Sequence, residues 1–358
     1  MARGASARIV VLATAVLLGV TGQAETVPRP LPAGYLSGVS LAMSNRPERG
    51  YDSARARCML EDLDARGVNA VSLMPFAFQK DPRSGVLEVP DERMPNAESP
   101  AQLRAGIRAA HARGLAVLLK PQIYVPRSWP GAILPASEVA FRAWWARYRS
   151  YVLGCARLAA EERVAGFCVG TELSLLQSRS EWRALVAEVR SLYPGFVVYA
   201  ANWDAVDVPF ADLLDACGVD LYEPLSADPE ATDEALSSGA RRIVARLDAL
   251  SARARRPVLL TEVGFAARER CWQRPNEERG AVDESAQRRT TRALLAALEG
   301  SRGVKGLFWW KAFSDGDAAR PGEGSFRITG RPAEPDLVRF FQRRIALAGA
   351  PRQRMLTN

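Results

Sequence analysis

The chain has 358 residues, of which 48% are hydrophobic and 25% are charged. This balance is typical of a globular protein with a large core and argues against a disordered or fibrous chain. The net charge of +8 at pH 7 raises the question of an anionic partner. The arginines are dispersed through Ala-rich stretches and we find no nucleic-acid-binding motif, so we predict no nucleic-acid partner.

The first 24 residues are typical of a secretory signal peptide. Arg3 and Arg8 supply positive charge, an apolar run extends from Ile9 to Val20, and Gly22-Gln23-Ala24 offers small residues at a cleavage site. The apolar run is shorter than the ~20 residues that a membrane-spanning helix needs. We therefore expect removal of residues 1–24, a secreted or periplasmic mature protein, and no stable membrane insertion afterwards. An uncleaved membrane anchor is the alternative.

The five cysteines all lie beyond the signal segment and lack the paired spacing of a metal site, so no metal is predicted. Because five is an odd number, at least one thiol must be free or paired between chains. These cysteines are Cys58, Cys155, Cys168, Cys217 and Cys271.

From residue 35 onwards, short apolar runs rich in β-branched residues alternate with longer stretches of helical period. Such alternation predicts repeated βα units around a parallel sheet. The predicted strands are 36–43, 69–75, 116–121, 164–171, 196–202, 217–222, 258–263 and 304–310. The predicted helices are 53–66, 100–113, 137–162, 179–193, 207–215, 232–255, 283–300 and 334–348.

Eight strands, each followed by a helix, predict an α/β fold of a single domain, a (β/α)8 TIM barrel. We place this domain at residues 25–348, with a polar tail at 349–358. Long loops rich in Pro, Gly and aromatic residues follow four of the strands, for example at 76–99 and 124–136. Barrel enzymes carry their sites on this C-terminal face of the strands, so we expect the functional rim there.

The chain contains a single histidine, His111. It lies near the end of the predicted helix 100–113, toward the N-terminal face of the barrel and away from the expected site. A Ser-His-Asp triad, an HExxH zinc site and a Cys-His dyad all need a histidine in the site. No GxGxxG follows a predicted strand and no P-loop is present, so the sequence lacks the usual nucleotide-binding motifs. We predict no cofactor.

Two glutamates close apolar strands, Glu172 after the fourth strand and Glu262 at the seventh, each directly after a threonine. A carboxylate there is costly unless it is paired or used. The fourth and seventh strands face each other across a barrel mouth, and retaining glycoside hydrolysis needs two carboxyl groups about 5 to 5.5 Å apart. We interpret the pair as catalytic, with Glu172 protonated at the start because burial and the charge of Glu262 raise its pKa. The alternative is two solvated glutamates that stabilise helix N-termini.

Aromatic and polar residues also gather at strand ends. Asn202-Trp203-Asp204 closes the fifth strand, Tyr222 the sixth, and Trp309-Trp310 the eighth. Sugar rings stack on indoles while amides and charges bind hydroxyls, so this mixture suits a carbohydrate ligand. Because side chains alternate along a strand, only one of Trp309 and Trp310 should point inward. Trp144, Trp145 and Trp182 lie at helical spacing and are interpreted as packing residues.

Eight short motifs occur in an order that resembles a known group. They are GVNAVSL at 67–73 with Pro75, LKPQ at 119–122, GTEL at 170–173, ANWD at 201–204, GVDLY at 218–222, TEVG at 261–264, FWW at 308–310 and GRPA at 330–333. In this order they resemble glycoside hydrolase family 113, a TIM-barrel family of clan A associated with endo-β-1,4-mannanase activity. The resemblance extends over nearly the whole mature chain.

The resemblance implies Glu172 as acid/base, Glu262 as nucleophile and Tyr222 as a hydrogen-bond partner of the nucleophile. It implies a substrate subsite lined by Lys120, Gln122, Asn202, Trp203 and either Trp309 or Trp310. The clan usually has an asparagine before the acid/base, where it contacts the sugar 2-hydroxyl, and this chain has Thr171. That contact must therefore be rearranged or supplied elsewhere. Glu223, beside Tyr222, is either solvated or in contact with a substrate cation.

Together these observations predict a secreted retaining glycoside hydrolase that cleaves a β-linked polysaccharide or oligosaccharide, with β-1,4-mannan as the leading substrate. One alternative is a noncatalytic carbohydrate-binding barrel of the cell envelope, which would keep the tryptophans without needing both glutamates. Another is a hydrolase of an anionic envelope or extracellular polysaccharide, which the positive charge favours.

Overall fold

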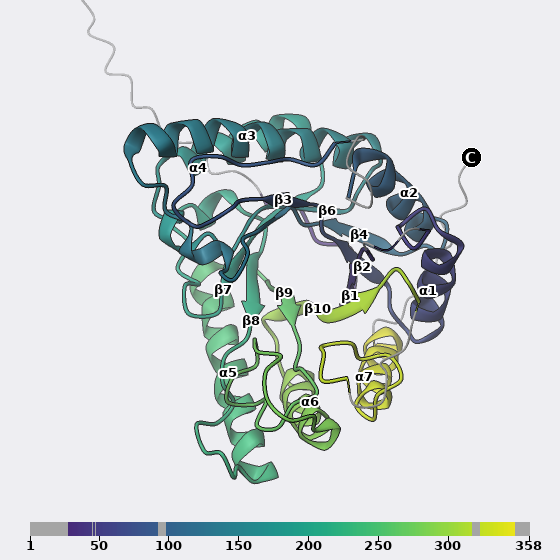
Figure 1. Cartoon of the computed structure of the whole chain (residues 1–358). Coiled ribbons are helices and arrows are strands. Elements are labelled where there is room, and N and C mark those ends of the chain that lie inside the picture. Colours follow the sequence, from purple (N-terminus) through teal and green to yellow (C-terminus); the bar gives the residue numbers. More distant parts are fainter. Residues whose placement is uncertain (1–27, 45, 47, 92–97, 317–322, 348–358) are drawn as a thin grey trace, which may run out of the picture.

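Eight parallel strands form a closed barrel in the computed structural model, which describes residues 28–44, 46, 48–91, 98–316 and 323–347. The strand order around the barrel is β1-β10-β9-β8-β7-β6-β4-β2, and Figure 1 looks into the ring that they form. The predicted (β/α)8 barrel is thus confirmed. The barrel strands are β1 (Leu36–Ala42), β2 (Ala70–Leu73), β4 (Ala116–Leu119), β6 (Gly166–Thr171), β7 (Phe196–Asn202), β8 (Cys217–Leu221), β9 (Val258–Val263) and β10 (Val304–Phe313).

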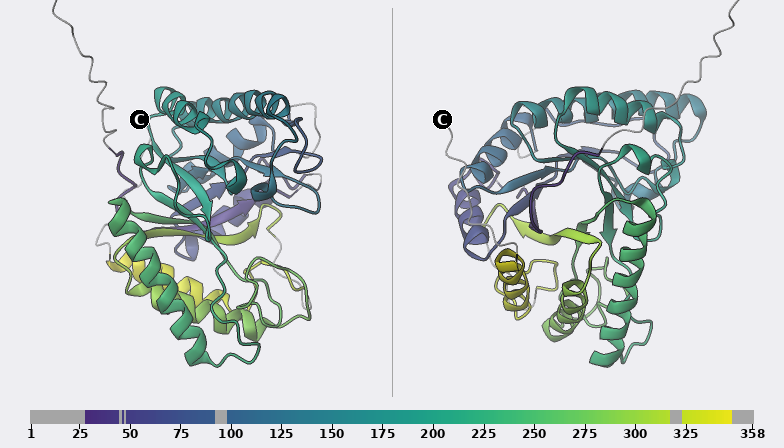
Figure 2. Two further views of the ribbon diagram at one scale, coloured as in Figure 1. Left: turned by 90° about the vertical axis from the view of Figure 1, so that its left-hand side faces the viewer. Right: turned by 180° about the vertical axis from the view of Figure 1, so that it is seen from behind.

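Helices surround the barrel on its outside, as the views from the side and from behind show (Figure 2). They are α1 (Ala54–Ala65), α2 (Pro100–His111), α3 (Glu138–Glu161), α4 (Glu181–Leu192), α5 (Asp233–Ala254), α6 (Glu284–Glu299) and α7 (Glu334–Leu347). Five of them begin after a residue whose side chain accepts a backbone N–H of the first turn, which satisfies a donor that the helix itself leaves unpaired. These residues are Ser53, Ser99, Ser137, Thr232 and Asp283.

The helix predicted at 207–215 is wrong, because this segment holds only the short 3-10 turn η3 (Ala211–Leu213). Pro209 disfavours the helical conformation of the residue before it and lies too far into the short segment to begin a helix. Tertiary contacts fix the segment instead. Phe210 stacks on Trp182 with ring centroids 5.2 Å apart, and both oxygens of Asp212 accept hydrogen bonds from Arg183 at 2.8 and 2.7 Å.

Two further short strands extend the barrel at its C-terminal face. β3 (Phe76–Phe78) and β5 (Gln122–Tyr124) pair in parallel as a separate two-stranded sheet directly after β2 and β4. The backbone N–H of Gln122 donates to the carbonyl of Pro75 at 2.9 Å. The sequence pattern did not predict this sheet, and its consequence is that Gln122 is fixed above the barrel mouth.

The core has two layers. The inner layer fills the barrel and includes Leu118, Cys168 and Phe308. The outer layer lies between barrel and helices and contains the three tryptophans that were interpreted as packing residues, which confirms that interpretation. His111 is the last residue of α2, the helix that leads into β4 at the N-terminal face, as expected.

The predicted signal peptide at 1–24 and the polar tail at 349–358 lie outside the described residues. Within the described ranges, none of the helices combines the length and the apolar character needed to cross a membrane. All five cysteines are unbridged thiols in this structure.

Candidate active site

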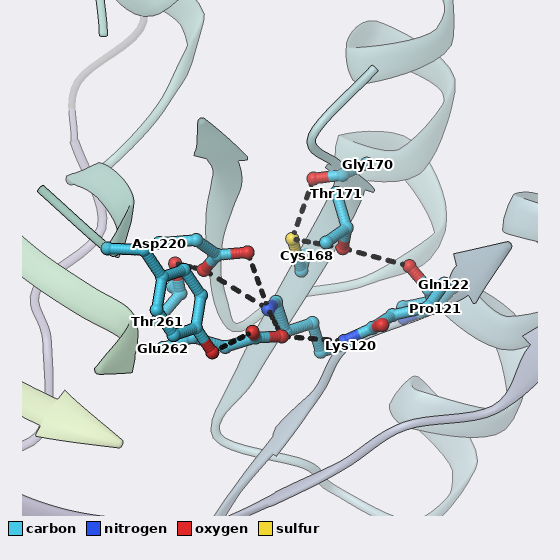
Figure 3. A network of polar contacts seen from close by, with 10 residues as sticks. Lys120, Pro121, Gln122, Cys168, Gly170, Thr171, Asp220, Thr261 and Glu262 are labelled. Carbon is cyan, nitrogen blue, oxygen red and sulfur yellow. Dashed lines mark hydrogen bonds and ion pairs between the residues drawn. The ribbon is translucent and has the colours of Figure 1, made fainter. Parts of the chain in front are cut away.

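The C-terminal ends of three strands bring a buried cluster of charges together at the barrel mouth (Figure 3). Lys120 follows β4, Asp220 lies in β8 and Glu262 in β9. The Lys120 and Asp220 side chains are fully buried, and Glu262 is 6% exposed. The Lys120 ammonium donates to both oxygens of Asp220, at 3.1 and 2.9 Å, and to Oε1 of Glu262. One lysine therefore bridges two carboxylates.

The Glu262 carboxylate accepts hydrogen bonds on both oxygens. Gln122 Nε2 donates to Oε1 at 2.8 Å, beside the lysine, and the Tyr222 hydroxyl donates to Oε2 at 2.8 Å. An ionised carboxylate has only acceptor sites, and all three partners present donors to it. Lys120 and Gln122 come from the segment after β4 and Tyr222 from the end of β8, so the carboxylate is held from two sides.

Glu172 follows β6 and has a left-handed backbone, with φ at 53°. This conformation costs roughly 1–2 kcal/mol for an L residue and persists only where the surroundings determine it. Its N–H donates to the carbonyl of Ala200 at 2.8 Å. Burial, followed by the negative charges of Asp220 and Glu262, raises the pKa of Glu172 well above its usual value. The group is therefore able to retain a proton at a pH where an ordinary glutamate is ionised.

Aromatic side chains form one side of the site. Trp203 and Trp310 pack against a small cluster of Tyr222, Ala266 and Phe326. The rings of Tyr222 and Phe326 meet edge to face at 6.2 Å. Because Tyr222 also contacts Glu262, this cluster places two partly buried indoles beside the carboxylates.

The structure decides between the two tryptophans of the eighth strand. Trp309 is fully buried in the outer core layer, where its ring meets Phe265 at 6.2 Å. Trp310 is half-buried and belongs to the cluster beside Tyr222. Trp309 is therefore not a lining residue of the site, which corrects its inclusion among the candidate substrate-binding residues. The cause is the side-chain alternation of β10.

Thr171 and Asn202 also lie at the rim, at the ends of β6 and β7. The Thr171 hydroxyl donates to the carbonyl of Pro121 at 3.1 Å, so its proton is already used while its lone pairs can accept another bond. Asn202 Nδ2 donates to Asp204 at 2.6 Å. Glu223 was expected either to be solvated or to contact a substrate cation. Its carboxylate instead pairs with Arg246 of α5.

Sequence reasoning missed Asp220 as a site residue. It stands in an apolar strand two positions before Tyr222, so strand alternation puts both side chains on one face. An acid within such a strand is itself a signal, because its burial is costly without a partner. Lys311 closes the predicted eighth strand among its aromatic and polar residues but was not named as a site residue. It is half-buried, its ammonium lies 4.6 Å from the centre of the Trp310 ring, and burial lowers its pKa.

The part of the chain that the structure describes contains no group of three or more His, Cys, Asp or Glu side chains arranged to hold a metal ion. In the cluster of Lys120, Asp220 and Glu262, one ammonium group instead offsets part of the negative charge of the two carboxylates. Two carboxyl groups in different environments, one bound by three donors and one with a raised pKa, are what general acid chemistry combined with nucleophilic attack requires.

Comparison with solved structures agrees with the barrel fold. The β-mannanase of glycoside hydrolase family 113 from Alicyclobacillus acidocaldarius, solved in complex with ManMIm, superposes with a TM-score of 0.77 at 24% identity, over 87% of this chain and 99% of that one. A complex of a family 113 β-1,4-mannanase gives a TM-score of 0.76 at 21% identity, over 86% of this chain and 99% of that one. A subfamily GH5_18 protein from Streptomyces cattleya, in complex with GlcNAc, gives 0.61 at 18% identity, over 89% and 82%.

At these identities the superpositions establish the fold. No curated protein matches the chain. The sequence profile described as Glycoside Hydrolase Family 113 matches residues 42–322, a span that includes every strand of the barrel from the end of β1 to β10 and all the carboxylates described above. The chain therefore belongs to glycoside hydrolase family 113.

Proposed function

We propose that this glycoside hydrolase cleaves a β-linked mannan with retention of configuration, with Glu262 as nucleophile and Glu172 as acid/base. The observation that carries the proposal is the contrast between the two carboxyl groups. Glu262 is held by Lys120, Gln122 and Tyr222, all of which donate to it. Glu172 has a raised pKa, caused by burial and by the nearby negative charges.

The first step follows from these protonation states. A Glu262 oxygen attacks the anomeric carbon while the bond from that carbon to the leaving oxygen breaks and Glu172 gives that oxygen its proton. The products are a glycosyl ester on Glu262, the released alcohol end of the chain, and an ionised Glu172. Because the Glu262 negative charge is consumed, the pKa of Glu172 falls and the residue becomes a base.

In the second step Glu172 removes a proton from water, whose oxygen attacks the anomeric carbon and releases Glu262 as a carboxylate. Glu172 ends protonated and Glu262 ionised, as at the start. Lys120, Gln122 and Tyr222 hold the carboxylate through both displacements. Trp203 and Trp310 offer apolar faces on which sugar rings can stack.

Covalent trapping tests the two roles. A mechanism-based fluoroglycoside, followed by peptide mass spectrometry, should label Glu262. Label on another residue would contradict the nucleophile assignment, and no label with any sugar would favour a noncatalytic binding barrel. Glu172→Ala should abolish most cleavage, and azide should restore part of it on a substrate with a good leaving group, because this anion attacks the glycosyl ester itself and needs no base. Unchanged activity in this variant would remove the acid/base assignment.

The support for mannan is that family 113 neighbours are named β-1,4-mannanases. The net charge of +8 keeps an anionic polysaccharide as the second candidate. Rates on neutral mannan and on acidic polymers, each measured over a range of ionic strength, distinguish them. Faster cleavage of an acidic polymer that falls steeply with added salt would identify the second candidate.

We also propose that the enzyme acts outside the cytoplasm, on the basis of the signal-like residues 1–24. Expression of the full chain in a bacterial host, followed by fractionation and N-terminal sequencing, tests this. The expected N-terminus is near Glu25. Recovery of the uncut chain in the cytoplasm would contradict export, and recovery of the uncut chain in the membrane would indicate an anchor.

A further inference from the structure

Asp220 is a third carboxylate in the site, and no step of the reaction described above uses it. It is fully buried at the end of β8. The Thr261 hydroxyl donates to its Oδ1 at 2.6 Å, and the Lys120 ammonium reaches both oxygens. Figure 3 shows Asp220 and Glu262 on either side of that ammonium. Burial of a carboxylate costs free energy unless the group is paired, so these contacts are what stabilises Asp220 in the fold.

Asp220 stabilises the charge of Lys120. Burial alone would lower the pKa of this lysine, but the charges of Asp220 and Glu262 outweigh burial and raise its pKa. Without Asp220, Glu262 would be the only full negative charge bound to the ammonium. The lysine would then be drawn wholly toward the nucleophile and would reduce the electron density available for attack.

Asp220 also affects the protonation of Glu172. After burial, the charge of Asp220 is the largest contribution that raises the pKa of Glu172, ahead of that of Glu262. Removal of the Asp220 charge therefore makes Glu172 lose its proton at lower pH. The pKa of Asp220 itself is raised to about 7, by burial and then by Glu262, against the opposing effects of Lys120 and Thr261, so its charge acts on Glu172 as the pH rises through this value.

We propose that Asp220 is a positioning residue, which shares the Lys120 ammonium with Glu262 and thereby fixes where that ammonium lies against the nucleophile. The inference rests on the proposed roles of Glu172 and Glu262. Titratable groups on the neighbouring strands and loops interact electrostatically with Asp220, Glu172 or Glu262, and all of them contribute to the pH profile. They are Lys120, Cys168, Glu172, Tyr199, Asp204, Tyr222, Glu262 and Lys311.

A matched control stands at the other end of the same strand. Asp215, just before β8, is also buried, and accepts hydrogen bonds from the Val197 N–H at 2.7 Å and from Arg190 at 2.7 Å. It lies at the N-terminal face, away from the carboxylates of the site. Asp215→Asn therefore replaces a buried aspartate by asparagine, as Asp220→Asn does, but at a position away from Glu172 and Glu262.

The experiment compares the two variants with the unaltered enzyme, on the polysaccharide that the unaltered enzyme cleaves. We expect Asp220→Asn to lower kcat on the order of 10- to 100-fold with KM little changed, because the geometry of attack is lost rather than binding. The alkaline side of its kcat/KM profile should move to lower pH. Asp215→Asn should lower the melting temperature and leave both kcat and the pH profile as they are.

An Asp220→Asn enzyme with unaltered kcat and pH profile would overturn the proposal, as would an equal effect of Asp215→Asn on the profile. If Asp220→Asn does not fold, Thr261→Val is the second probe. This variant removes one hydrogen bond that lowers the pKa of Asp220, so less of the Asp220 charge remains near Glu172. The alkaline side of the kcat/KM profile should then move to lower pH by a smaller amount, and an unmoved profile would contradict the proposal. Trapping on Glu262 separates the two ideas. Label elsewhere refutes the proposed function, whereas label on Glu262 with an unaltered Asp220→Asn profile refutes only this inference.

Discussion

Tyr222 donates its hydroxyl to Oε2 of Glu262 at 2.8 Å, on the oxygen opposite to the one that Lys120 and Gln122 bind. Tyr222→Phe removes this bond alone and keeps the ring packed against Phe326. A hydrogen bond to a charged group is worth about 1.5–3 kcal/mol. We expect kcat to fall by roughly 10- to 100-fold with little change in KM, measured by initial rates.

Tyr193→Phe is the control for this change. The Tyr193 hydroxyl is also buried and donates to the carbonyl of Val164 at 2.7 Å, at the opposite end of the barrel. Its loss should cost stability without affecting kcat. A Tyr222→Phe enzyme that loses no more kcat than Tyr193→Phe would show that the contact to Glu262 does not contribute to the reaction.

Trp310 and Trp309 are adjacent in the chain but face different layers, so their substitutions should have different effects. Trp310→Ala removes a stacking surface from the rim and should weaken binding by about 0.5–1.5 kcal/mol, which is a rise in KM of roughly 2- to 12-fold. Trp309→Phe changes a fully buried ring whose Nε1 has no hydrogen-bond partner. It should lower the melting temperature and leave KM unchanged. The reverse pattern would mean that Trp309 faces the sugar.

The pH profile of the unaltered enzyme follows from Glu172. This group must be protonated to act as an acid, and burial with its negative neighbours raises its pKa. The alkaline side of the kcat/KM profile should therefore lie well above 4.5, the ordinary value for a glutamate. Glu172→Gln should remove this titration and spare kcat/KM on substrates whose leaving group needs no proton, such as activated aryl glycosides, because kcat/KM reports the first step. A profile that already falls near 4.5 would show that Glu172 is ionised in the free enzyme.

The barrel could be predicted from the sequence because its signals are local and repeated. Apolar runs such as 258–263 alternate with helical stretches, and the ring order follows from the right-handed βα connection. The segment 207–215 was mispredicted because the local pattern was helical while Pro209 and the contacts of Phe210 and Asp212 decided its shape. The pair β3 and β5 depends on pairing between strands, which a local pattern does not contain.

The site was predictable to the level of residue types at strand ends. Glu262 was named from its place at a strand end and Lys120 and Gln122 from the family resemblance, and the structure brings their polar atoms into contact. Asp220 was missed because the role of a buried acid depends on which charge folds against it, and Lys120 lies 100 positions away. Trp309 and Trp310 could not be told apart, since alternation gives the period but not its phase.

The stability of the folded chain should depend on pH through Asp220. Its pKa is raised to about 7 in the fold, from 3.8, by burial and by the charge of Glu262. Between these two values the folded chain holds a proton that the unfolded chain has lost, so this group's contribution to stability is largest below 3.8 and is lost as the pH rises toward 7. Asp220→Asn has no such titration. The melting temperature of the variant, relative to that of the unaltered enzyme, should therefore rise from pH 4 to pH 7 and then stay level.

Scanning calorimetry of both proteins over this range measures the difference, and Asp215→Asn provides the comparison with a buried aspartate that lies outside the carboxylate cluster. A difference that stays constant or falls with pH would mean that Asp220 is ionised throughout, which would place its negative charge in the site even at acidic pH.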